Sequence, residues 1–175
     1  TAWGLSGRLD GIIWMVTEAL GVSITTFSAQ NFGARNYDRM RKGYHTSLLL
    51  SFVLIGGLSG VLLVFSGPLS RLFIDDASIS AYTTTIIHFI APFYAIFSII
   101  ENASGSIRGA GVSFQPMVLT IFGTVVLRVI WLFAIMPLDP SLEHLLLVYP
   151  VTWIITATMF TIYHHSGNWL GRATA

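Results

Sequence analysis

Five long apolar runs constrain the fold of this chain more than any other feature. They cover about residues 9–29, 46–65, 81–100, 117–135 and 145–163. A helix rises about 1.5 Å per residue, so a run of about 20 residues spans the roughly 30 Å hydrocarbon core of a bilayer. The runs therefore predict an all-α fold, a polytopic transmembrane helix bundle with five spans.

Composition favours a membrane protein over a soluble one. Of 175 residues, 54% are hydrophobic and 10% are charged, and the mean hydropathy is +0.73, whereas soluble domains carry about 25% charged residues. The net charge of +1 is too small for the broad positive field that attracts nucleic acid, so we expect no nucleic-acid partner. The absence of cysteine excludes disulfides, thiolate metal sites and a cysteine nucleophile.

No linker divides the chain, so residues 1–175 are predicted to form a single transmembrane domain. The chain begins at Thr1, and its first apolar run lacks the basic segment and small-residue cleavage site of a signal peptide. We therefore expect a piece of a longer polytopic protein that lies in the lipid bilayer of the cell membrane, meaning the inner or plasma membrane.

Short polar passages predict where the spans end. The passage from Gln30 to Lys42 is the most strongly charged, and it is predicted to be a membrane-surface loop between the first two spans. Gly67-Pro68 is predicted to end the second span, and the passage from Gly105 to Gly111 to form a turn-rich connection.

The Lys and Arg residues predict the orientation of the chain. One side of the membrane would receive Arg35, Arg39, Arg41, Lys42, Arg108 and Arg172, and the other only Arg8 and Arg71. Cytoplasmic loops carry the excess of Lys and Arg, so we expect the first side, together with the carboxy terminus, to be cytoplasmic.

Three ionisable residues, Glu18, Glu101 and Arg128, fall inside the predicted spans. A charge there costs at least a few kcal/mol, so each needs a partner, a water-filled cavity or a changed protonation state. Helical rise puts Glu18 and Arg128 about 18 Å and Glu101 about 10 Å from the cytoplasmic surface. Arg128 could therefore reach Glu101 on the adjacent helix or Glu18 at equal depth, but it cannot neutralise both.

The unbalanced acid is the candidate for ion coupling, because it must hold a proton or a cation such as sodium. If Arg128 pairs with Glu101, then Glu18 carries the proton or sodium ion. The structural alternative is a Glu101–Arg128 pair that holds two helices in register, with Glu18 exposed to a watery vestibule.

Polar and aromatic side chains inside the spans are candidates for a substrate path. The aromatic candidates for stacking on flat organic cations are Trp14, Tyr94, Trp131, Tyr149 and Trp153. The polar candidates are Ser23, Thr25, Thr26, Ser28, Asn102, Ser104, Thr120, Thr124 and Thr152. From these sets we select Thr25, Asn102, Tyr94, Trp131 and Trp153. The alternatives are interhelical hydrogen bonds for the polar groups and an interfacial belt for the aromatic ones.

Four passages carry a resemblance to a known family. They are Gln30-Asn31-Phe32-Gly33-Ala34, the stretch from Glu101 to Gly111 with Arg108-Gly109, Leu127-Arg128-Val129-Ile130-Trp131, and Tyr149-Pro150-Val151-Thr152-Trp153. Their order resembles the carboxy-terminal half of multidrug and toxic compound extrusion (MATE) transporters. The resemblance implies helices eight to twelve, part of one six-helix lobe in a two-lobe transporter.

The resemblance also implies a function and partners. Such transporters export cationic and polyaromatic drugs in exchange for protons or sodium ions and need no cofactor beyond that ion. The expected partners are the amino-terminal lobe and the seventh helix of the same transporter, and small organic cations as substrates. Some sodium-coupled members place an aspartate where this chain has Phe97, and the nearest acid here is Glu101, so the coupling ion stays open between proton and sodium.

Two other functions fit parts of the sequence. Gly57-Leu58-Ser59-Gly60 has the Gly-x-Ser-Gly form of rhomboid intramembrane proteases, and His88 on the next span could serve as the base. This pattern arises easily by chance among apolar spans, so we predict no enzyme, and we expect His88 to be a hydrogen bonder between helices. A membrane assembly subunit without transport of its own is the third alternative.

Overall fold

The computed structural model describes residues 2–73, 76–138, 140–167 and 169–170. Within that part every regular element is helical, and five helical stretches are long and apolar enough to cross a membrane. The predicted all-α fold with five spans is therefore confirmed. The elements are α1 Ala2–Leu9, α2 Gly11–Gly33, α3 Tyr37–Phe73, α4 Ala77–Ile90, the 3₁₀ turn η1 Ala91–Phe93, α5 Tyr94–Gly109, α6 Phe114–Thr120, the π-helical segment η2 Ile121–Val126, α7 Leu127–Ala134 and α8 Leu142–Ser166.

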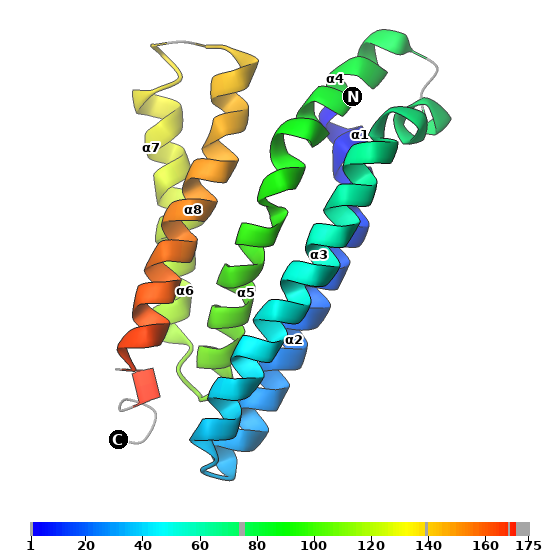
Figure 1. Ribbon diagram of the computed structural model, residues 1–175. Helices are drawn as coiled ribbons and strands as arrows, with labels where there is room; N and C mark the ends of the chain where they lie inside the picture. The colour runs from blue at the N-terminus through cyan, green and yellow to red at the C-terminus, as the bar shows by residue number, and fades with distance from the viewer. Residues whose placement is uncertain (1, 74–75, 139, 168, 171–175) are drawn as a thin grey trace.

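Helix α5 lies at the centre of the bundle. It packs against α2 and α3 on one side and against α8 on the other, and Figure 1 shows α6, α7 and α8 standing apart from the α2–α3 pair with α5 between them. Together α4, η1 and α5 form one span, and α6, η2 and α7 form another. The arrangement therefore joins two helical groups through a single central element.

The outer surface of the bundle is apolar. On α3 the side chains of Val53, Val61 and Val64 are more than half exposed, and Phe133 on α7 is 80% exposed. Such a surface is unstable in water and suits contact with lipid tails. The structure thus gives the physical basis for a membrane location.

The charged passage between the first two spans is more helical than predicted. Helix α2 continues to Gly33 and α3 begins at Tyr37, so only a tight turn separates them, in which Arg35 has φ of 56°. The Asn36 carboxamide oxygen accepts a hydrogen bond from the Arg39 backbone N–H at 3.2 Å, which caps the start of α3. The prediction of a long surface loop was wrong because this capping lets helix formation start within the polar passage.

Gly67-Pro68 does not end the second span. Helix α3 runs through Pro68 to Phe73. Proline has no N–H, so Pro68 leaves the Val64 carbonyl, four residues earlier, without its helical donor. Serines on either side of Pro68 bond other carbonyls of the helix: Ser66 Oγ donates to Leu63 O at 3.1 Å and Ser70 Oγ to Gly67 O at 2.9 Å. Figure 1 shows the last turns of α3 leaving the axis of the rest of the helix, as expected beyond a proline.

The glycine-rich passage after Glu101 is also helix and not a turn. α5 continues through Gly109, and the turn follows at Ala110–Gly111, where Gly111 has φ of 86°. The glycines serve close packing: a Cβ on Gly109 would lie 2.5 Å from Thr25 O, and one on Gly105 would lie 2.8 Å from Gly21 O. Small residues let membrane helices approach closely, so this passage brings α5 against α2.

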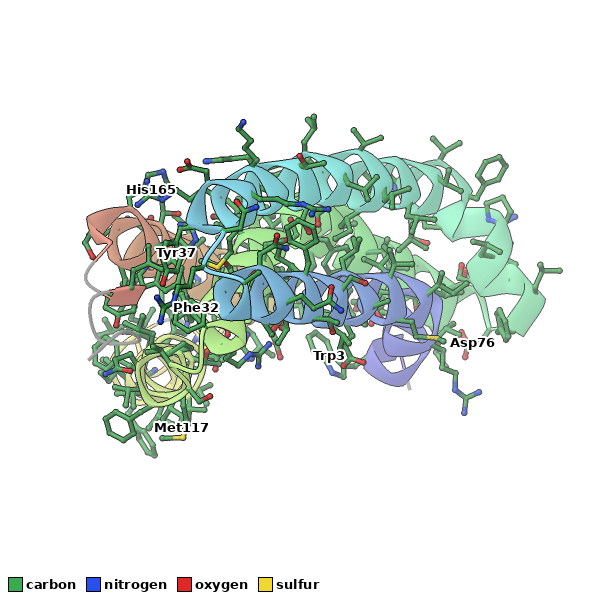
Figure 2. All side chains as sticks on the ribbon, turned by 90° about the horizontal axis from the view of Figure 1, so that it is seen from below. Trp3, Phe32, Tyr37, Asp76, Met117 and His165 are labelled. Atoms are coloured by element: carbon green, nitrogen blue, oxygen red, sulfur yellow. The ribbon has the colours of Figure 1, made fainter. Side chains whose placement is uncertain are left out.

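Five of the basic side chains, Arg35, Arg39, Arg41, Lys42 and Arg108, lie at one end of the bundle. The α2–α3 turn, the α5–α6 turn and the end of α8 share that end, and the α7–α8 connection and the start of α4 lie at the other (Figure 1). Figure 2 shows Phe32, Tyr37, Met117 and His165 towards the first end and Asp76 at the other. Arg172, which was predicted for the basic side, lies outside the described residues.

Candidate functional site

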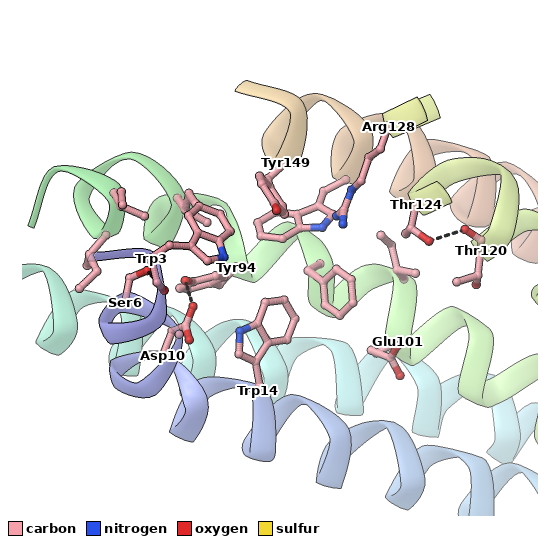
Figure 3. Close-up of a pocket in the computed structure, with 17 residues that line it drawn as sticks. Trp3, Ser6, Asp10, Trp14, Tyr94, Glu101, Thr120, Thr124, Arg128 and Tyr149 are labelled. Carbon is pink, nitrogen blue, oxygen red and sulfur yellow. Dashed lines mark hydrogen bonds between the residues drawn. The ribbon is translucent and has the colours of Figure 1, made fainter. Parts of the chain in front are cut away.

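A cavity of about 480 Å³ opens between the two helical groups. Its polar and charged lining consists of Ser6, Asp10, Glu101, Thr120, Thr124 and Arg128. Isoleucines of α4 and α5 complete the apolar part. Figure 3 shows that α1, α2, α5 and the α6–α8 group all contribute side chains, so the cavity exists only when these elements pack together.

An aromatic wall forms one side of the cavity. Its members are Trp3, Trp14, Tyr94, Phe97, Tyr149 and Trp153. The Trp14 ring centroid lies 4.9 Å from that of Phe97 and 6.0 Å from that of Trp153, both in edge-to-face geometry. Edge-to-face contacts are favourable for aromatic pairs. They hold the rings together as a continuous surface built from α1, α2, α5 and α8.

Asp10 lies beside this wall, directly before α2. The Tyr94 hydroxyl donates a hydrogen bond to Asp10 Oδ2 at 2.6 Å, whereas Oδ1 is buried and has no hydrogen-bond partner in the described part of the chain. Burial raises the pKa of Asp10 above its ordinary value, although the hydrogen bond from Tyr94 and the polar interaction with the nearby Trp14 indole partly oppose the rise. A carboxylate with one unpartnered buried oxygen can take up a proton or bind a cation.

Glu101 lines the cavity closer to the basic end. Its Oε2 lies 3.9 Å from Nη2 of Arg108, and the side chains of Arg108 and Glu101 are 44% and 27% exposed. A Cβ on Gly21 would lie 2.9 Å from this same oxygen, so the carboxyl group rests against α2. The charge of Glu18, one turn away on α2, is close enough to act on Glu101.

Arg128 does not form the predicted ion pair. Its guanidinium lies 4.5 Å from the Tyr149 ring centroid, and its Nε donates to Thr152 Oγ1 at 3.5 Å. The prediction came from depth alone, which says nothing about rotation around the helix. The π-helical segment η2 directly precedes α7, and its wider turns change the direction in which Arg128 projects.

Glu101 pairs with a different arginine from the one predicted. The charge of Glu18 acts on Glu101, and the ion pair found in the described residues is between Glu101 and Arg108. Glu18 is exposed and does not line the cavity. Within the described residues, no group of three or more His, Asp or Glu side chains could hold a metal ion.

The predicted substrate-path residues divide into two sets. Tyr94 and Trp153 line the cavity, but Thr25, Asn102 and Trp131 do not. Asn102 instead bonds Ser47 and Ser51 of α3. Thr25 Oγ1 donates to Gly21 O at 2.7 Å, and Trp131 Nε1 donates to His144 O at 3.0 Å. Asn102 thus forms hydrogen bonds between helices, which was the alternative to a place on the substrate path.

The serine and histidine of the protease-like pattern do not pair. His88 Nε2 lies 3.0 Å from Ser66 Oγ, and the Ser59 hydroxyl is buried without a hydrogen-bond partner in the described residues. Ser66 lies about two turns beyond Ser59 on α3. His88 therefore has the interhelical role that we predicted for it.

Sequence reasoning missed Asp10, Trp3 and Ser6. Asp10 stands at the very start of the first apolar run, where an acid is typical of the membrane surface, and nothing in the sequence shows that α1 folds over it. One signal was present: Asp10 and Trp14 stand four residues apart and so share one helix face. Because Trp14 is a candidate for stacking on a cation, the acid one turn before it is a candidate to bind the same cation.

The family-motif residues lie mainly at helix ends and helix contacts. Gln30, Asn31 and Gly33 are in the last turn of α2, and Ala34 begins the turn that follows. Arg108 and Gly109 end α5. Tyr149 and Pro150 are inside α8, where Tyr149 supports Arg128 on its ring face.

Comparison with known proteins identifies related sequences. A family model described as MatE matches residues 1–133. The chain is 24% identical over 121 residues to "Probable multidrug resistance protein YoeA" of Bacillus subtilis, covering 69% of this chain and 26% of that protein. It is 29% identical over 113 residues to "Probable multidrug resistance protein NorM" of Aromatoleum aromaticum, and 26% identical over 117 residues to the protein of that name from Thermotoga maritima. These matches cover 64% and 65% of this chain and 24% of each relative, so the chain spans about a quarter of the length of these relatives.

Proposed function

Because this chain belongs to the MatE family, we propose that it forms part of a multidrug efflux transporter that exports cationic or polyaromatic compounds in exchange for protons or sodium ions. The relatives named above are described as probable multidrug resistance proteins, which supports export of this kind. The observation that carries the proposal is the aromatic-walled cavity with acids in its lining.

The chemistry of the cavity favours flat organic cations. Indole and phenol faces attract cations by about 0.5–2 kcal/mol each, depending on desolvation. Two acids, Asp10 and Glu101, and one cationic side chain, Arg128, line the space, so the lining carries one excess negative charge when both acids are ionised. Arg128 already rests on Tyr149, which leaves Trp14, Tyr94 and Trp153 as the faces for substrate.

Ion coupling is proposed for the acid pair Glu18 and Glu101. Arg108 pairs with Glu101, and the nearby charge of Glu18 acts on Glu101 as well, so one of the two acids must accept a proton or a sodium ion when it loses access to water. We retain Glu18 as the first candidate because its carboxylate is the one without an arginine. Arg128, which was predicted to be the partner, is proposed to orient substrate through Tyr149.

The remainder of the transporter is proposed to complete the cavity. Transport by alternating access needs two lobes moving around a central site, so we propose that an amino-terminal lobe and a seventh helix partner this chain. The protein is proposed to lie in the cell membrane with its basic end and carboxy terminus in the cytoplasm, following the bias of Lys and Arg.

Efflux by the full-length transporter in proteoliposomes tests the substrate proposal. With ethidium as the flat cation, Trp14→Ala and Trp153→Ala are each expected to raise the half-saturating concentration about fivefold to thirtyfold, the loss of one desolvated cation–aromatic contact. Trp131→Ala serves as the matched control, because Trp131 does not line the cavity, and it should leave this concentration unchanged. Equal effects at all three tryptophans would contradict the assignment of the cavity.

A further inference from the structure

A second hollow lies between α2 and α3, away from the central cavity. This basic-rimmed groove has a volume of about 510 Å³, and its lining includes Leu20, Phe27, Arg39, Lys42, Gly43 and Leu50. The Phe27 ring lies against Gly43, where a Cβ would collide with it. The missing side chain thus lets the ring sink between the helices and leaves an apolar floor.

The two basic side chains stand at one end of the groove. Arg39 and Lys42 lie four and seven residues beyond Arg35 in the α2–α3 turn, so they are about 6 and 10 Å from that turn along the helix axis. Leu20 and Leu50 each lie fifteen residues from Arg35, at a depth of about 22 Å. The groove therefore runs from headgroup level into the hydrocarbon, cationic at its outer end and apolar at its inner end.

The cations at the rim lack an acidic partner in the described part of the chain. The ion pair found in the described residues, between Arg108 and Glu101, lies away from the groove. The groove lining contains no Asp or Glu. The Arg39 guanidinium lies 5.7 Å from the Phe27 ring centroid, which holds it over the groove. Asp38 follows the same turn but does not line the groove.

We propose that this groove binds one anionic phospholipid, with the phosphate between Arg39 and Lys42 and an acyl chain along Phe27 towards Leu20 and Leu50. Charge complementarity selects this occupant. A packed apolar helix would cover the floor but would leave both cations unpaired, whereas a lipid phosphate pairs with them and its chain fills the apolar end. The proposal needs only the two membrane spans and does not depend on transport.

Native mass spectrometry of the full-length protein, stripped of lipid in detergent, tests this site. Dioleoyl phosphatidylglycerol is expected to bind more tightly than dioleoyl phosphatidylcholine. The double variant Arg39→Gln/Lys42→Gln should weaken binding of the anionic lipid about 25-fold, since each basic side chain near an anionic headgroup contributes about fivefold. Arg35→Gln/Arg41→Gln is the matched control, because it removes the same charge from residues that do not line the groove, and it should leave binding unchanged.

Two further measurements distinguish binding of the acyl chain from binding of the phosphate and from occupation of the groove by another segment. Ser23 is exposed in the groove lining, so Ser23→Trp should fill the space and weaken binding of both lipids without a change in charge. Glycerol phosphate, which lacks acyl chains, should not displace the bound lipid. If both charge variants weaken lipid binding equally, the effect comes from general surface charge. If neither Arg39→Gln/Lys42→Gln nor Ser23→Trp weakens binding, another segment fills the groove. Either result overturns the proposal.

Discussion

Asp10 is the residue of the cavity best suited to hold either a proton or a cation. It combines a hydrogen bond from Tyr94 with a buried oxygen that lacks a partner in the described residues. Burial favours the neutral form of the carboxyl group, so its pKa is raised. An organic cation beside Asp10 would favour the charged form, so proton and cation are expected to compete for this group.

The raised pKa of Asp10 predicts a pH-dependent effect on stability. An acid whose pKa is higher in the folded than in the unfolded protein binds its proton more tightly when folded, so its unfavourable contribution disappears as pH falls through the folded pKa. Asp10→Asn carries no charge at any pH. We expect the variant to be more stable than the parent at pH 8 by on the order of 1 kcal/mol, and the gap to close towards pH 4. Thermal unfolding followed by tryptophan fluorescence checks this, and a gap that widens on acidification would contradict it.

Glu18 is the residue on which the proposed coupling depends. Glu18→Gln imitates the permanently protonated acid, so the full-length transporter should still bind ethidium but lose most of the dependence of efflux on the ion gradient. Ethidium flux measured with and without imposed proton and sodium gradients decides this. Glu143 lies outside the cavity lining, so Glu143→Gln is the control and should respond as the parent does. An unchanged gradient response in Glu18→Gln would assign the coupling to Glu101 or to the other lobe.

The depth of a residue in the membrane, calculated from helical rise, predicts some features of the cavity lining but not others. Helical rise placed Arg128 within reach of Glu101, and although both residues line the cavity, they do not form an ion pair. It failed to predict the partner of each charge, because the π-helical segment before Arg128 and the nearby Arg108 change which groups meet. Asp10 could not be found in this way, since its burial depends on the packing of α1 and α5.

Among the helices, the length of the apolar runs predicted the membrane spans correctly. The glycine and proline residues, however, led to wrong predictions of where these helices end. Glycine and proline stop helices in soluble proteins, yet membrane helices tolerate them when neighbouring groups bond the free carbonyls or when close packing is needed. Pro68 lies inside α3, which continues beyond it to Phe73. Gly105 and Gly109 illustrate the second, and no local sequence rule separates this role from a turn.

The close packing of α5 on α2 predicts a position-specific effect of added volume. A Cβ on Gly109 would lie 2.5 Å from Thr25 O and 2.6 Å from Ser28 Cβ, and both neighbours belong to α2, so Gly109→Val should destabilise the protein by about 1–3 kcal/mol. Gly57→Val is the control, because a Cβ on Gly57 meets nothing within 4 Å. Thermal unfolding in detergent measures both. Similar losses in the two variants would show that general helix effects, and not the α2–α5 contact, determine the stability.

At the scale of the whole molecule, the chain forms two helical groups that enclose a cavity along α5. The described part places aromatic rings from α1, α2, α5 and α8 around one space, although these rings are up to 150 residues apart in sequence, from Trp3 to Trp153. Family membership could be inferred from short motifs because these motifs form the helix ends and contacts that set the packing. The shape of the cavity could not, since it depends on how the helices rotate around their axes.

The location of a bound cation tests the central claim most directly. The full-length transporter is crystallised with a bromine-labelled tetraphenylphosphonium ion, and the anomalous signal of bromine locates the ligand. The cavity assignment predicts a peak between the aromatic wall and Asp10, within contact distance of Trp14 or Trp153, and its loss in Asp10→Asn/Trp14→Ala crystals. A peak elsewhere in the bundle, or one that persists undiminished in the double variant, would contradict it.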